Sequence, residues 1–187
     1  RRMTRAAIAG DGWVEGARRV PSPNCDARPD GVAVELAVIH AISLPPGKFG
    51  SDDILDLFLN RLDPDRDPYF PGICELRVSA HFLIRRDGEL IQFVSCNDRA
   101  WHAGVSCWSG RERCNDFSLG VELEGCDDLP FEAAQYETLR RLLLTLCAHF
   151  PLRGMAAHAD IAPGRKTDPG PCFDWRELSS IPLKRPS

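Results

Sequence analysis

The apolar run from Val34 to Ile39 most constrains the fold of this 187-residue chain. Glu35 is its only charged residue, and a short apolar run bounded by turn residues is typical of a buried strand. A Pro-Pro-Gly sequence follows at 45–47, which predicts an exit from the strand into a loop. His40 therefore lies where a buried strand ends and a loop begins.

Three further strands and two helices are predicted around this strand. The Asp87-Gly88 pair is a strong signal for a hairpin turn between two strands. Apolar residues recur at helical spacing in two segments, and Pro151 ends the second of them. The strands are expected over 80–85, 90–94 and 118–123, and the helices over 52–62 and 132–150.

Length and composition favour one compact domain of the α+β class. Hydrophobic residues make up 43% of the chain and charged residues 27%, which are ordinary values for a globular domain. The chain has no internal repeat, low-complexity tract or interdomain linker. We predict a single domain over residues 13–178, with terminal extensions at 1–12 and 179–187.

Charge and cysteine spacing indicate where such a protein works. A net charge of -4 argues against nucleic-acid or anionic-membrane binding, which normally requires a basic surface. Arg1, Arg2 and Arg5 are not followed by the apolar stretch of a signal peptide or membrane span. We therefore expect a cytoplasmic protein. The 8 cysteines include no CxxC pair, so we interpret them as reduced thiols in or near the core.

The segment 158–170 places an imidazole, a carboxylate and a lysine in one loop. Its prolines and glycines argue against a helix or strand, and functional residues concentrate on such loops. His158 and Asp168 are both ordinary zinc ligands, and a catalytic zinc has three protein ligands. His40 is our candidate for the third ligand. Spacing alone leaves the site open, since a lone histidine at a strand end is more often a hydrogen-bonded core residue.

Six segments, in order along the chain, resemble the bacterial cytoplasmic amidases that act on N-acetyl-anhydromuramyl-L-alanine. This family belongs to a superfamily of zinc amidases with phage lysozyme-amidases and peptidoglycan-recognition proteins. The resemblance extends from Trp13 to Trp175 and implies a central mixed β-sheet flanked by helices, with zinc in a cleft at one side. The matching segments are Ser22–Asn24, Val38–Gly47, Val78–Ile84, Arg99–Gly104, Arg113–Gly125 and His158–Gly170.

The resemblance implies that His40, His158 and Asp168 hold the zinc ion. Related amidases outside this branch use a cysteine as the third ligand beside the two histidines. Cys172, four residues after Asp168, is therefore an alternative to that aspartate. The matching motif carries the aspartate, and we therefore prefer Asp168.

An amide hydrolase also needs a group that moves a proton and a group that stabilises an oxyanion. Strand alternation places Glu122 and Glu124 on the same face, so periodicity does not choose between them. The family motif assigns the proton transfer to Glu122, and it makes Lys166 the oxyanion partner. Judged by the residues alone, both carboxylates are equally well solvated or paired with arginines, and Lys166 is a surface lysine.

For substrate binding, the resemblance points to Tyr69, Arg77, Trp101 and Arg113. Aromatic faces suit a sugar or peptide, and arginine binds carboxylates with two hydrogen bonds. The chain departs from the family at Ala41, where close relatives usually carry asparagine, so one polar contact to the substrate is in question.

Two further histidines receive no chemical role. We predict that His81 is a core or near-site histidine, and that His102 lies in a loop bordering the cleft.

Together these implications describe a zinc-dependent enzyme that hydrolyses the amide between anhydro-N-acetylmuramic acid and L-Ala of the stem peptide, in peptidoglycan recycling. We expect a monomer that takes a small muropeptide and binds neither nucleic acid nor membrane. A non-catalytic muropeptide-binding recognition module is one alternative, although the predicted ligands and Lys166 are all present. A periplasmic amidase acting on intact peptidoglycan is the other.

Overall fold

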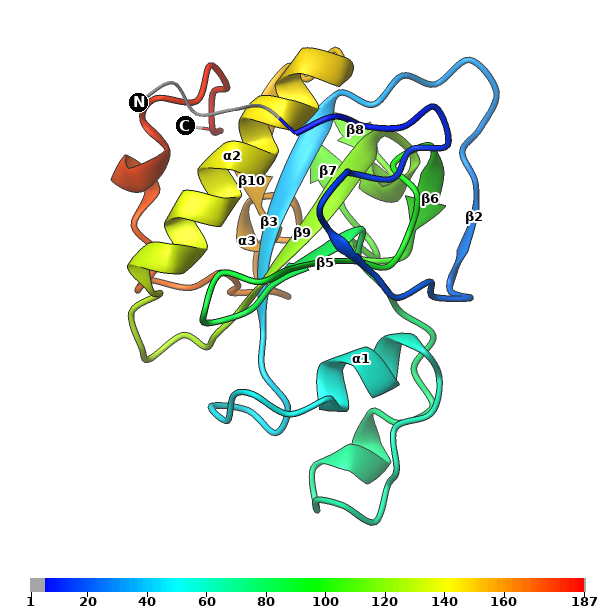
Figure 1. The fold of residues 1–187 in the computed structure, drawn as a ribbon, viewed down its shortest axis with the longest axis vertical. Coiled ribbons are helices and arrows are strands. Elements are labelled where there is room, and N and C mark those ends of the chain that lie inside the picture. The colour runs from blue at the N-terminus through cyan, green and yellow to red at the C-terminus, as the bar shows by residue number, and fades with distance from the viewer. Residues whose placement is uncertain (1–5, 187) are drawn as a thin grey trace.

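The structure, a computed structural model, describes residues 6–186. Arg1, Arg2 and Arg5, which we noted in the sequence, lie outside the described residues. A six-stranded mixed sheet forms the centre of the described part, with the strand order β1-β5-β4-β9-β3-β10 (Figure 1). The strands of this sheet are β1 (Arg18–Arg19), β3 (Leu36–Ile42), β4 (Phe82–Ile84), β5 (Leu90–Gln92), β9 (Ser118–Glu124) and β10 (Gly154–Ala157).

Two long parallel strands, β3 and β9, lie next to each other in this sheet. Their register pairs Leu36 with Ser118 at one end and His40 with Glu122 near the other. Strand β10 runs parallel to β3 on its free side, and β4 runs parallel to β9. All four expected strands are present with shifted ends, and the α+β class with a central mixed sheet is confirmed.

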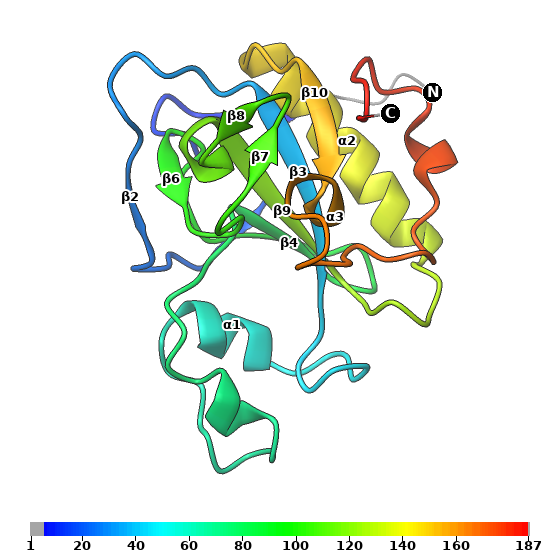
Figure 2. The same ribbon diagram turned by 180° about the vertical axis from the view of Figure 1, so that it is seen from behind.

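Helix α2 (Ala133–His149) lies along one face of the sheet, as Figure 1 shows. Leu139, Leu143 and Leu146 are fully buried there in one core with Ile39 and residues of β9. The backbone amide of Glu132 donates to the Gln135 side chain (3.0 Å) at the start of the helix, which satisfies one free end group. The opposite face carries smaller elements (Figure 2): α3 (His158–Ile161), the 3-10 helix Cys114–Phe117, and the hairpin of β7 (Cys107–Trp108) and β8 (Arg111–Glu112).

A lobe built around α1 (Asp53–Phe58) extends beyond one end of the sheet (Figure 1). The predicted helix over 52–62 is too long, because Asn60 has a positive φ of 60° and ends the helical path. The chain then returns through the 3-10 helix Phe70–Gly72, and Phe70 is buried in a second core with α1. Arg66 fastens the intervening loop, since its guanidinium lies 2.7 Å from carboxylate oxygens of Asp53 and Asp56.

Segments near both termini also contact the domain. Ile8 forms an isolated bridge with Val14, and Met155 of β10 donates its amide to the carbonyl of Lys184 (3.0 Å). Within residues 6–186, no helix has the length and apolar character needed to cross a membrane. The remaining elements are the antiparallel pair β2 (Cys25–Ala27) and β6 (Asp98–Ala100), and the 3-10 helix Trp175–Leu178.

Candidate active site

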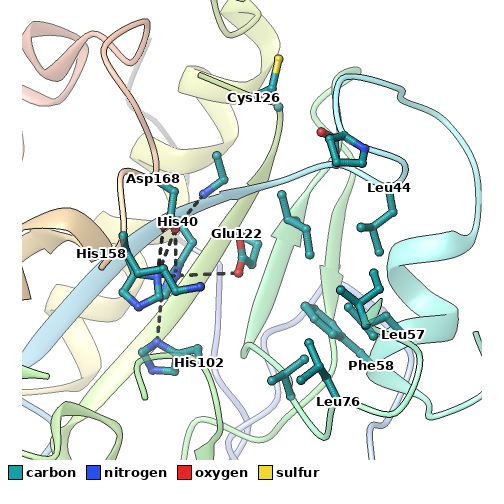
Figure 3. A pocket seen from close by; sticks show the side chains of 18 of the residues that line it. His40, Leu44, Leu57, Phe58, Leu76, His102, Glu122, Cys126, His158 and Asp168 are labelled. Carbon is teal, nitrogen blue, oxygen red and sulfur yellow. Dashed lines mark hydrogen bonds and ion pairs between the residues drawn. The ribbon is translucent and has the colours of Figure 1, made fainter. Parts of the chain in front are cut away.

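Three side chains converge at the end of the sheet where the parallel strands β3 and β10 finish. His40 lies near the end of β3, and His158 directly follows β10. Ala157 is paired with Ile39 across the two parallel strands, so the next residues along the chain, His158 and His40, lie side by side. The Nδ1 atoms of the two imidazoles are 3.0 Å apart. Asp168 reaches back from the next loop, and its Oδ2 lies 3.2 Å from each Nδ1 atom (Figure 3). The parallel pairing of β3 and β10 thus brings together His40 and His158, which are far apart in sequence.

The hydrogen bonds of His158 fix the position of its proton. Its Nε2 atom lies 3.0 Å from the carbonyl oxygen of Ala103, which only accepts, so Nε2 carries the hydrogen and Nδ1 carries a lone pair. Burial lowers the pKa of His40, which favours the neutral ring. Burial alone would raise the pKa of Asp168, but contacts with the two imidazoles hold that pKa well below its ordinary value. A carboxylate and imidazole nitrogens that converge in this way suit a divalent metal ion.

The alternative ligand Cys172 is not part of this group. Among the described residues, the histidine, cysteine and carboxylate side chains close enough to share an ion here are His40, His158 and Asp168, whose ligand atoms all lie within 4.8 Å of one another.

Glu122 projects from β9 toward the same point. It pairs with His40 across the two strands, and its Oε1 lies 3.8 Å from His40 Nδ1. Its Oε2 is buried without a hydrogen-bond partner in the structure. Burial and the negative charge of Asp168 raise the pKa of Glu122 well above its usual value, although Lys166 acts in the opposite direction. This carboxyl group is therefore suited to accepting a proton.

Glu124, on the same face of β9, has a different environment. It is 2% exposed and forms an ion pair with Arg85 at 2.8 Å. Its two carboxylate oxygens also accept hydrogen bonds from the backbone amides of Gly50 and Arg86. The structure thus separates the two carboxylates that strand periodicity could not: Glu124 is engaged in holding loops, and Glu122 faces the metal-binding group.

A cavity of about 620 Å³ opens in front of these residues. One wall is polar and contains His40, Glu122, His158, Lys166 and Asp168. The facing wall is apolar and is contributed largely by the α1 lobe and its flanking loops, as Figure 3 shows. Its side chains include Leu44, Leu57, Phe58 and Leu76.

The four residues predicted to bind the substrate do not all line the same cavity. Tyr69 and Trp101 both line the large cavity, and Tyr69 is 48% exposed. Arg113 lines a neighbouring cavity of about 470 Å³, to which Trp101 also contributes. Arg77 lines neither cavity, and its guanidinium donates to the carbonyl oxygen of Glu75 at 3.1 Å. The structure therefore places two of the four in the cavity that also contains His40, His158 and Asp168.

His102, which we expected only to border the cleft, contacts His40 directly. Its ring packs edge-on against His40 with centroids 4.9 Å apart, and its Nδ1 lies 2.8 Å from His40 Nε2. Gly120 was the available signal, because glycine inside a strand often marks the close approach of another group. A Cβ atom at Gly120 would lie 2.5 Å from Cγ of His102.

Comparison with known proteins agrees with this geometry. Residues 30–171 match the N-acetylmuramoyl-L-alanine amidase family, and the chain belongs to that family of enzymes. It is 57% identical over 175 residues to the 1,6-anhydro-N-acetylmuramyl-L-alanine amidase AmpD of Escherichia coli, covering 92% of this chain and 96% of the relative.

Solved structures give the same result. A crystal structure of a selenomethionine derivative of AmpD superposes with a TM-score of 0.89 at 52% identity, covering 94% of this chain and 99% of the other. The amidase AmiD of E. coli, in complex with the substrate anhydro-N-acetylmuramic acid-L-Ala-D-γ-Glu-L-Lys, has a TM-score of 0.60 at 29% identity. That match covers 95% of this chain and 66% of AmiD.

Proposed function

We propose that this protein is a zinc-dependent amidase that hydrolyses the bond between anhydro-N-acetylmuramic acid and L-Ala of the stem peptide. The observation that supports it most strongly is the convergence of His40, His158 and Asp168 at the wall of a cavity large enough for a muropeptide. The name of the E. coli relative and the substrate in the AmiD complex supply the chemical identity of the bond. We further propose that the enzyme acts in the cytoplasm, in peptidoglycan recycling.

The residues fit this ion, because His40, His158 and Asp168 offer two imidazole nitrogens and one carboxylate, an ordinary zinc ligand set. When bound, zinc supplies a Lewis acid that polarises a carbonyl group and lowers the pKa of water from about 15.7 toward ~7.

Glu122 and Lys166 supply the rest of the chemistry in this proposal. Glu122 accepts a proton from the attacking water and delivers it to the departing amide nitrogen, for which its raised pKa is favourable. Lys166 also lines the cavity, and its ammonium group stabilises the negative charge that develops on the carbonyl oxygen. The water oxygen first bonds to the carbonyl carbon, and the C–N bond breaks afterwards as the carbonyl re-forms and the nitrogen takes the proton from Glu122. A free amine and a carboxylate are released.

The two walls of the cavity suggest how the substrate is oriented. The scissile amide lies at the polar wall, and Tyr69 and Trp101 offer aromatic faces to the sugar or the peptide. Arg113, in the neighbouring cavity beyond Trp101, is placed to receive a carboxylate of the stem peptide. We propose Arg77 as a further carboxylate contact on the resemblance alone.

The test uses zinc-loaded protein with anhydromuramyl-tripeptide, and the products are identified by mass spectrometry. We expect free tripeptide and the anhydro sugar acid as the two products. We also expect Lys166→Met to lower kcat on the order of 100-fold, since removal of one oxyanion-stabilising group has this effect. Lys48→Met, which changes an exposed lysine outside the cavity, is the matched control. Binding of the muropeptide without any release of peptide would instead indicate a recognition module, and equal rates for the two lysine variants would exclude the role of Lys166.

A further inference from the structure

One short segment contacts both metal-site imidazoles on the side away from Asp168. His102 places its Nδ1 2.8 Å from His40 Nε2. The next residue, Ala103, accepts a hydrogen bond at 3.0 Å from His158 Nε2 through its carbonyl oxygen. The same dipeptide, residues 102–103, is thus the hydrogen-bond partner of the Nε2 atoms of both rings.

The contacts of His102 extend to the first residue of β9. Its Nε2 lies 3.1 Å from the Ser118 hydroxyl oxygen. When His102 Nε2 donates to that hydroxyl, His102 Nδ1 carries a lone pair and accepts the hydrogen of His40 Nε2. His40 Nδ1 is then left with a lone pair, as His158 Nδ1 already is. Both lone pairs face the carboxylate of Asp168, which is the arrangement that a metal ion requires.

The 102–103 segment is itself held on several sides. The Asn115 side-chain oxygen accepts from both backbone amides of the segment, at 3.1 Å for His102 and 2.8 Å for Ala103. The imidazole of His102 fits over Gly120, where any side chain would collide with it. Arg165 donates a second hydrogen bond to the Ala103 carbonyl at 2.7 Å. These contacts together fix the position of His102 and Ala103.

We propose that the 102–103 segment, anchored by Asn115 and Ser118, sets the tautomers of His40 and His158 so that both Nδ1 atoms are free to bind the metal. This inference rests on the proposed zinc site. His102, Asn115 and Ser118 act through the ligands and are positioning residues. Partners that orient the imidazole ligands of a metal typically contribute 10- to 100-fold in metal affinity.

The first test compares two variants of nearly equal size. His102→Asn keeps a side-chain acceptor near the position of Nδ1, whereas His102→Leu removes it. Zinc affinity is measured on the metal-free proteins by competition with a chromogenic chelator, without any assay of activity. We expect His102→Leu to bind zinc roughly 10- to 100-fold more weakly than the wild type, and His102→Asn to recover most of the loss. Asn115→Leu and Asn115→Asp form a second pair with the same expected order.

The second test observes the protons directly. Long-range ¹⁵N–¹H spectra of the metal-free wild type distinguish the two tautomers of each histidine, and we expect hydrogen on Nε2 of both His40 and His158. Ser118→Ala should shift His40 toward the Nδ1-protonated form while His158 stays unchanged, and this variant serves if His102→Leu does not fold.

The outcomes separate the two proposals. Equal zinc affinity for His102→Leu and the wild type, or an Nδ1 hydrogen on His40 in the wild type, would overturn the role of the segment. Failure of the wild type to bind zinc would instead overturn the proposed function, whatever the tautomers are.

Discussion

Among single residues, burial lowers the pKa of His40, His81 and His102 and so favours their neutral rings. His81 shows this most clearly. Its Nδ1 accepts from the amide of Gly120 at 3.1 Å, and its Nε2 donates to the carbonyl of Asp98 at 2.9 Å. Burial, reinforced by the nearby guanidinium of Arg28, lowers the pKa of His81 to about 3. The ring therefore connects β9 with the first residue of β6 as an uncharged hydrogen-bonding group.

This lowered pKa predicts how stability depends on pH. The unfolded chain binds a proton at His81 below about 6.5, whereas the folded chain does so only near 3, so acid favours unfolding between these values. We expect His81 to contribute up to about 1.4 kcal/mol per pH unit to the loss of unfolding free energy in that window. Urea unfolding of metal-free wild type and His81→Gln, from pH 7 to about 4, measures the difference in slope. His149→Gln, at an exposed histidine, is the control, and identical slopes for all three proteins would show that the pKa of His81 is not lowered by folding.

Residue by residue, the sequence limited the candidates better than it assigned their roles. Strand alternation correctly places Glu122 and Glu124 on one face of β9, yet their difference depends on Arg85, which is distant in the chain. His102 carried no local signal of its contact with His40, because that contact depends on how a loop crosses Gly120. Contacts between remote segments decide both cases.

At the scale of elements, the ends of three strands position the site. The apolar run made β3 predictable, and its first five residues are buried; β9 is buried along its whole length. Their adjacency was not predictable from periodicity, since a parallel pair is joined only through a long connection. The end of α1 was misjudged for a similar reason: apolar residues at helical spacing continue to Leu62, but Asn60 turns the chain so that Leu62 packs in the second core.

The buried ion pair between Arg85 and Glu124 supports the end of β9, and its loss should be costly. We expect Arg85→Met to lower the free energy of unfolding by about 3–5 kcal/mol, because the Glu124 carboxylate would stay buried without its partner. Arg141→Met should change it by less than about 1 kcal/mol, since its ion pair with Glu137 is exposed on α2. Urea denaturation of both variants tests this, and a loss as small for Arg85→Met as for Arg141→Met would show that the buried pair does not support the strand.

In the whole molecule, the cavity lies between the ends of the central strands and the α1 lobe. Its polar wall comes from strand ends and the segment 158–170, which begins with the short helix α3 rather than with the expected loop, and its apolar wall comes largely from the lobe (Figure 3). The sequence predicted the polar group through the resemblance to a family of amidases. The apolar wall could not be predicted in the same way, because Leu44, Leu57, Phe58 and Leu76 come from separate segments and meet only in the folded lobe.

We propose that His40, His158 and Asp168 hold a zinc ion that amide hydrolysis requires. The most direct measurement determines zinc content and tripeptide release on the same samples of wild type, Asp168→Ala and Cys172→Ala, before and after treatment with a chelator. We expect one zinc ion per chain and peptide release for wild type and Cys172→Ala, both abolished by the chelator, and neither property for Asp168→Ala. Retention of zinc and activity by Asp168→Ala, or release of peptide by the fully chelated wild type, would contradict this proposal.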